Sequence, residues 1–199
     1  MGTMRLCRGD LLEASTAIAH GCNVVGAMGA GVAADIKQAF PSMYDEYHQL
    51  CKDHKVRPGD IFASEQLLNG RNIMVYNLMT QTGLNGADMQ FMREAFERMI
   101  DDANKRNISI ITIPMIGAGL GGISPSVCFN IYLEAVEKYN GRLNVIVQYI
   151  EHVKPHPITD DTHDPRNMYK RAMEQAKTQA MKAEFVKEAA PNLLKDRPE

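Results

Sequence analysis

Apolar and polar positions alternate along the chain in a way that predicts strands and helices in turn from residue 4 to residue 150. Apolar runs of strand length are expected at 4–8, 16–22, 60–68, 72–80, 108–113 and 143–150. Apolar residues at helical spacing fall between them, over 30–40, 42–54, 88–106 and 124–139. This order predicts an α/β fold, a three-layer α/β/α sandwich around a central mixed sheet.

Turn and capping residues mark several boundaries between these elements. Asn69-Gly70 stands between two expected strands and predicts a tight hairpin turn. Pro41 should separate the first two helices, and Ser124-Pro125 should form the N-cap and first residue of the last helix.

The composition changes near residue 153, where the domain formed by 1–153 is expected to end. Residues 154–164 are rich in Pro and Asp and are interpreted as a linker. The segment 165–199 should be a C-terminal helical extension: a helix with a thin apolar seam to about residue 189, then a frayed tail. Two interpretations stay open for that helix, packing back on the domain and self-association.

Glycine is concentrated in two loops, each between an expected strand and an expected helix. The loops 21–31 and 114–123 hold eight of the fifteen glycines. Glycine lets a ligand approach the backbone closely, and free N–H groups at a helix N-terminus attract an anion. The two loops therefore predict a cradle for a diphosphate or a nucleotide.

Two common nucleotide-binding motifs do not fit the positions of these loops. Gly117-x-Gly119-x-x-Gly122 matches the dinucleotide-binding fingerprint, but it follows the penultimate strand instead of the first. Neither loop ends in Gly-Lys-Ser/Thr, as a P-loop would.

Charge and composition narrow the class of partner. A formal net charge of −2 argues against broad nucleic-acid binding. No apolar run approaches the ~18 residues of a membrane span, and the N-terminus does not resemble a secretion signal. The four cysteines lack metal-ligand spacing, so we expect reduced thiols in a cytoplasmic protein with no metal and no cofactor.

Three motifs in order carry a resemblance to a known family. They are Gly9-Asp10-Leu11-Leu12, the segment AHGCN (19–23) leading into GAGVA (29–33), and IPMIGAGLGG (113–122). In this order and spacing they resemble the macrodomain family, whose members bind ADP-ribose and related metabolites. The resemblance covers roughly residues 4–150. The AH-x-CN and MGAGVA segments look most like the branch with ADP-ribose 1″-phosphate phosphatase and terminal ADP-ribose glycohydrolase.

The resemblance implies a set of ligand contacts. Asp10 would accept a hydrogen bond from the adenine amine, the first glycine loop would lie beside the distal ribose, and the second would wrap the diphosphate. The ligand-binding positions that follow are Asp10, Leu11, Gly29, Ala30, Gly31, Val32, Thr80, Gln81, Ile116, Gly117, Ala118, Gly119, Leu120 and Gly121.

Three residues are candidates for catalysis, each with a structural alternative. His20 matches a histidine of the phosphatase-like relatives, but a histidine on an apolar strand is often a hydrogen-bonded core residue. Asn23 could orient a water or simply bond its own turn. Asp88 could act as an acid near the ligand or only cap a helix.

Two positions depart from the glycohydrolase branch. Gln81 stands where that branch has a lysine nucleophile, and Gly121 stands where it has an aspartate. Lysine-plus-aspartate chemistry is therefore unavailable at these positions. The leading hypothesis is hydrolysis at the distal ribose, with ADP-ribose 1″-phosphate as first substrate. The alternatives are a non-catalytic reader of ADP-ribose metabolites and a docking module whose C-terminal helix is the functional element.

Overall fold

The computed structural model describes residues 3–14, 16–138 and 143–149. The expected linker 154–164 and C-terminal extension 165–199 lie outside these residues. In chain order, with η for a short 3-10 turn, the elements are β1 (Thr3–Arg8), η1 (Leu11–Glu13), β2 (Ala17–Asn23), α1 (Gly31–Ala39), α2 (Pro41–Lys52), β3 (Ile61–Leu68), β4 (Arg71–Gln81), α3 (Met89–Lys105), β5 (Ile110–Ile113), η2 (Gly119–Gly121), α4 (Pro125–Lys138) and β6 (Asn144–Tyr149).

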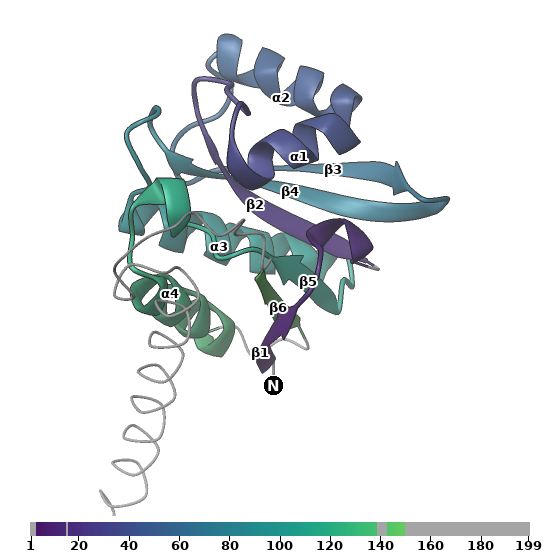
Figure 1. The fold of residues 1–199 in the computed structure, drawn as a ribbon, viewed down its shortest axis with the longest axis vertical. Helices are drawn as coiled ribbons and strands as arrows, with labels where there is room; N and C mark the ends of the chain where they lie inside the picture. Colours follow the sequence, from purple (N-terminus) through teal and green to yellow (C-terminus); the bar gives the residue numbers. More distant parts are fainter. Residues whose placement is uncertain (1–2, 15, 139–142, 150–199) are drawn as a thin grey trace, which may run out of the picture. The chain divides into compact units, whose positions relative to one another are not determined.

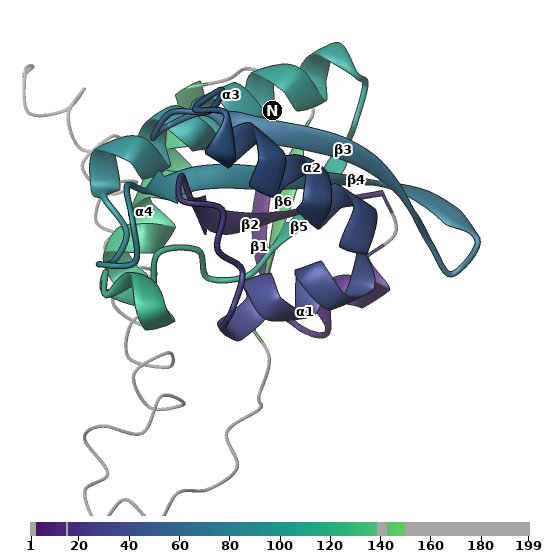
Figure 2. The ribbon, with the colours of Figure 1, turned by 90° about the horizontal axis from the view of Figure 1, so that it is seen from above.

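The described strands form one mixed sheet in the order β1-β6-β5-β2-β4-β3. All neighbouring pairs are parallel except β3 with β4, which is antiparallel. Asn69 and Gly70 join β3 to β4 with φ angles of 50° and 77°, the two left-handed positions that a two-residue hairpin turn requires. Figure 2 shows this hairpin extending past its neighbours. The mixed sheet and the hairpin expected from the sequence are confirmed.

Helices cover both faces of the sheet, with α1 and α2 on one side and α3 and α4 on the other (Figure 1). Strand β2 contributes side chains to both hydrophobic cores, because successive side chains of a strand point to opposite faces of the sheet. Ala17 and Ala19 join the core under α3 and α4, whereas Ile18 and Cys22 join the core under α1 and α2. The three-layer sandwich is therefore confirmed.

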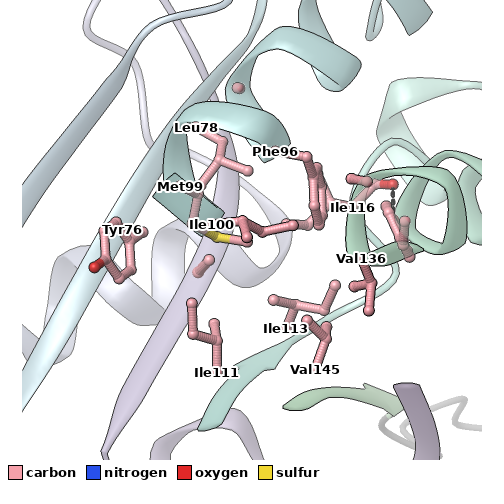
Figure 3. Close-up of a cluster of buried hydrophobic side chains, with 14 of the residues drawn as sticks. Tyr76, Leu78, Phe96, Met99, Ile100, Ile111, Ile113, Ile116, Val136 and Val145 are labelled. Carbon is pink, nitrogen blue, oxygen red and sulfur yellow. Dashed lines mark hydrogen bonds between the residues drawn. The ribbon is translucent and has the colours of Figure 1, made fainter. Parts of the chain in front are cut away.

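The core under α3 and α4 also anchors the loop that follows β5. Tyr76 and Leu78 of β4 face Phe96 and Met99 of α3 across this core, with Ile116 of the β5–α4 loop at its edge (Figure 3). The Phe96 ring stacks on Tyr132 with centroids 4.5 Å apart, and the Tyr132 hydroxyl donates to the Ile116 carbonyl. The start of the second glycine loop is thus tied to the interior.

Element boundaries follow the local signals with small shifts. Phe40 leaves the helical conformation between α1 and α2, and Pro41 opens α2 as its first residue. The strand expected from 108 begins at Ile110, because Asn107 takes a φ of 58° and Ile108 still donates to the Ala103 carbonyl at the end of α3. The short turns η1 and η2 were not expected, since three-residue segments carry no periodicity.

Candidate functional site

Three loops meet at one edge of the sheet. They follow β2 (24–30), β4 (82–88) and β5 (114–124), and these parallel strands end on the same side. Hydrogen bonds join the loops: Val24 N–H donates to Gln81 O at 3.2 Å, and Ala87 N–H donates to Gly121 O at 2.9 Å. Ligands in open α/β sheets bind at this edge.

The two glycine loops are neighbours in space. Leu120 Cδ1 lies 3.7 Å from the position that a Cβ would take on Gly31. Gly21 of β2 allows Ile116 of the second glycine loop to pack closely against this strand. A Cβ on Gly21 would stand only 3.0 Å from side-chain atoms of both Ile116 and Thr80. The convergence of the loops expected from the sequence is therefore present.

Both loops present N–H groups that no side chain caps. Ala30, the N-cap residue of α1, makes no capping hydrogen bond, and the first turn of α1 has no acidic residue. The N–H groups of Gly31, Val32, Gly119 and Leu120 have no acceptor within the part of the chain that the structure describes. Uncapped N–H groups at a helix start are suited to an anion such as a phosphate.

Exposed apolar side chains lie on the same three loops. Among the described residues, the large hydrophobic side chains classed as exposed are Val25, Leu67, Leu84, Met89 and Leu120. All but Leu67 lie on the three loops or at the start of α3. Exposed apolar side chains on loops that also present free N–H groups are typical of small-molecule sites, where apolar contact supplies affinity and a few polar groups orient the ligand.

Asp10 and Leu11 follow β1, which ends at the same edge as β2. The Asp10 side chain is exposed and accepts from Leu12 N–H at 2.9 Å through one carboxylate oxygen. Its other oxygen has no partner in the described residues, so it is available to an amine. Leu11 is buried in the core under α1 and α2, which leaves its backbone for ligand contact.

His20 is a buried residue of β2. Its Nε2 is 2.8 Å from Asn77 Oδ1, and Asn77 Nδ2 donates to Phe62 O. The Asn77 oxygen therefore accepts and His20 Nε2 donates. Burial lowers the pKa of His20 to about 4, which the hydrogen bond to Asn77 opposes only in part. The structure thus favours the core interpretation of His20 over the acid–base one.

Asn23 holds the first glycine loop from inside. Its Oδ1 accepts from Val25 N–H at 3.1 Å and Ala27 N–H at 3.0 Å, and its Nδ2 donates to Ala27 O at 2.8 Å. The side chain is only 5% exposed. These contacts fit the alternative in which Asn23 orders its own turn.

Asp88 caps α3, and part of its carboxylate remains available. Oδ1 accepts from Gln90 N–H at 2.7 Å and Phe91 N–H at 3.2 Å. Oδ2 has no partner within the described residues, and the side chain is exposed. Asp88 N–H donates to Thr80 O, which places the residue at the end of β4. Capping therefore leaves one oxygen of Asp88 free to bind a water.

Thr80 and Gln81 are the last two residues of β4 and lie at the same edge of the sheet. Thr80 is buried and its Oγ1 donates to Cys22 O at 3.4 Å, whereas Gln81 is half-buried. Gln81 is the position where the resemblance implied a lysine, and an amide offers hydrogen bonds but no nucleophile.

Cysteine thiols and metal ligands are two further kinds of group that could supply chemistry. The cysteines are free, and Cys22, Cys51 and Cys128 are buried. Burial raises the pKa of Cys22, which disfavours its thiolate. No three His, Cys, Asp or Glu side chains in the described ranges could hold a metal ion together. No helix in those ranges is long and apolar enough to cross a membrane.

Two residues that hold the first glycine loop carry no sequence motif. Tyr47 and His48 of α2 bond the backbone of Asn23 and Gly26. Helical spacing places Tyr47 on the apolar face of α2, but only the tertiary contact shows that its hydroxyl reaches the loop.

Two curated proteins similar to this chain are named for reactions of ADP-ribose compounds. The chain is 31% identical over 166 residues to the DNA ADP-ribosyl glycohydrolase of Thermus aquaticus. This match covers 82% of the present chain and 46% of the relative. It is 38% identical over 76 residues to the ADP-ribose 1″-phosphate phosphatase of Meyerozyma guilliermondii. That match covers 36% of the present chain and 43% of the relative. The matches thus span less than half the length of either relative.

A solved structure and a family model agree with the architecture. The macrodomain of Thermus aquaticus DarG superposes with a TM-score of 0.66 and 31% identity, over 75% of this chain and 99% of that one. The model of the Macro domain family matches residues 19–132, more than half of the chain. The chain therefore belongs to the Macro domain family, as the order of its motifs indicated.

Proposed function

We propose that this protein binds an ADP-ribose derivative across its two glycine loops and hydrolyses a group at the distal ribose. The observation that carries the binding proposal is the proximity of Leu120 to Gly31, which brings together two loops with uncapped N–H groups. Two adjacent sets of N–H groups suit the two phosphates of a diphosphate. Asp10 at the end of β1 is the proposed acceptor for the adenine amine.

ADP-ribose 1″-phosphate is the proposed first substrate. A relative in Meyerozyma guilliermondii is named as the phosphatase of that compound. In the proposed step, water attacks the phosphorus, the bond to the ribose oxygen breaks, and inorganic phosphate and ADP-ribose result. Asp88 is the proposed base: the carboxylate oxygen left free by the cap would accept a proton from the water and pass it to the ribose oxygen that leaves. Main-chain N–H groups would stabilise the charge that develops on the phosphate.

Two other candidate groups have no part in this proposal. His20 is buried with its Nε2 engaged by Asn77, so the proposal gives it no proton-transfer role. Gln81 supplies no amine, which rules out a lysine-type covalent intermediate at that position.

A phosphate-release assay with ADP-ribose 1″-phosphate tests the hydrolysis, and calorimetry with ADP-ribose tests the binding. We expect binding of ADP-ribose that AMP does not match, together with release of inorganic phosphate. No release at saturating substrate would reject the phosphatase activity. Binding no tighter than that of AMP would reject the site itself.

A non-catalytic reader is the second candidate. The hydrogen bonds of the Asn23 side chain to its own loop and the buried environment of His20 favour it, because they support a structural role for two of the three groups expected to act on water. Tight binding of ADP-ribose without turnover of its 1″-phosphate or of ADP-ribosyl esters would establish the reader and exclude the enzyme.

A further inference from the structure

Helix α2 contacts the first glycine loop through three side chains on adjacent turns, those of Tyr44, Tyr47 and His48. The Tyr47 hydroxyl donates to Asn23 O at 2.7 Å, and the oxygen of that hydroxyl lies 3.1 Å from Asn23 Oδ1. His48 Nδ1 lies 3.0 Å from Gly26 O, and Tyr44 donates to the same carbonyl at 3.4 Å. Every one of these acceptors belongs to the segment 23–26, which leads into the N–H groups at the start of α1.

The backbone of this segment lies directly on α2. Gly26 has a φ of 79°, and a Cβ there would stand 2.8 Å from His48 Nδ1 and 3.3 Å from Cys51 Cβ. A side chain at this position would therefore push the loop away from the helix. The absence of one allows the Gly26 carbonyl to reach the imidazole.

The donor groups are themselves held in place. The Tyr44 and His48 rings stack with centroids 5.7 Å apart, and Lys37 Nζ of α1 lies 3.9 Å from the centre of the Tyr44 ring. Tyr47 is fully buried, and this burial raises its pKa, so its hydroxyl keeps the proton that it donates. A carbonyl can only accept, so His48 Nδ1 carries the proton in this contact.

We propose that Tyr47 and His48 are positioning residues that fix the first glycine loop in its ligand-binding conformation. The inference rests on the proposed function, since the loop is assigned to ligand binding there. Neither side chain needs to touch the ligand. Their role is to order residues 23–27 before binding, so that the entropic cost of ordering the loop does not reduce the affinity for the ligand.

The test compares four variants with the wild-type protein. Tyr47→Phe removes only the hydroxyl, and His48→Leu removes the ring donor. His48→Asn keeps an amide donor near the place of Nδ1, so it should rescue the loop. Gln49→Leu is the control, because Gln49 is exposed on the same helix and bonds only Asp53 there.

Calorimetry with ADP-ribose and amide hydrogen exchange provide the two readouts. We expect about tenfold weaker binding for Tyr47→Phe and His48→Leu, the loss of one hydrogen bond each. His48→Asn should recover most of the affinity, and Gln49→Leu should retain all of it. The amides of Val25 and Ala27 should exchange faster in the two weak variants while strand amides keep their protection.

Two outcomes would overturn the inference. One is wild-type affinity in both Tyr47→Phe and His48→Leu. The other is a loss of affinity accompanied by faster exchange throughout the strands, which would mean general destabilisation. Failure of the wild-type protein to bind ADP-ribose is distinct, because it rejects the proposed function. Exchange at Val25 and Ala27 then still decides whether Tyr47 and His48 order the loop.

Discussion

Leu120 reaches across from the second glycine loop to Gly31 in the first, with its Cδ1 3.7 Å from the point where a Cβ of residue 31 would stand. The contact joins segments that are almost ninety positions apart along the chain. Gly31 opens helix α1 with a φ of 58°, and Leu120 lies within the turn η2. A ligand that used the N–H groups of both loops would lie against this pair.

Replacing Gly31 by Ala should weaken ADP-ribose binding by at least tenfold. A Cβ in the left-handed region costs roughly 1–2 kcal/mol, and it would also project toward Leu120, where the ligand is proposed to lie. Gly70→Ala is the matched control, because Gly70 has a φ of 77° and open space around it in the β3–β4 turn. Both variants should lose similar stability in urea unfolding. Equal affinities of the two variants by calorimetry would contradict the placement of the ligand.

Leu120→Ala should reduce affinity for ADP-ribose several-fold without lowering the unfolding midpoint. The side chain is 75% exposed, so the free protein gains little from it, whereas a bound nucleotide would cover it. Partial burial of a leucine is worth about 1 kcal/mol, or roughly fivefold in affinity. Leu67→Ala on β3 serves as the control, since Leu67 is 67% exposed on the hairpin. An unchanged dissociation constant for Leu120→Ala would place the ligand elsewhere.

Local sequence signals predicted much of the fold. Asn69-Gly70, Pro41, Asp88 and Ser124-Pro125 each act on their own neighbours, and each turn or helix start lies where the sequence placed it. The glycine loops were also visible, because a run of glycines marks a loop by itself. Their contact followed from the rule that parallel strands end at one edge of a sheet.

The environments of individual side chains depended on distant partners. Asn77 is 57 positions from His20, so the hydrogen bond between them could not be inferred from either strand alone. The same holds for Tyr47 and Asn23, which are 24 positions apart. In both cases the residue type fits two roles, and the partner decides between them. The sequence therefore predicted that the two glycine loops lie at one edge of the sheet more securely than it predicted the roles of the candidate acid–base groups.

Burial of neutral His20 should make stability fall as the pH is lowered. The native pKa is about 4, against an ordinary value of 6.5, so between these values the unfolded chain binds a proton that the native protein does not. Stability from this site is complete above pH 6.5 and declines as the pH falls toward 4. The loss should reach about 3 kcal/mol at most, and urea unfolding at pH 7, 6 and 5 measures it.

His20→Gln isolates this effect, because an amide can still donate to Asn77 and does not titrate. The stability difference between wild type and variant should therefore shrink as the pH falls from 6.5. Turnover of ADP-ribose 1″-phosphate should change less than about threefold, a small loss beside that of a general acid–base group. A hundredfold loss of turnover with intact binding would return His20 to the catalytic role.

Asp88 can be tested by separating its capping role from its charge. Asparagine is as good an N-cap as aspartate, so Asp88→Asn should keep the hydrogen bonds to Gln90 and Phe91 while removing the base. Asp88→Ala loses the cap as well, which costs about 1 kcal/mol of stability.

If Asp88 activates water, both variants should lose turnover about a hundredfold or more, and only Asp88→Ala should unfold at a lower urea concentration. If Asp88 is only a cap, Asp88→Asn should match the wild type in turnover and in stability. Phosphate release and urea unfolding on the same preparations distinguish these outcomes, because the carboxylate oxygen that caps α3 is not the one left free for water.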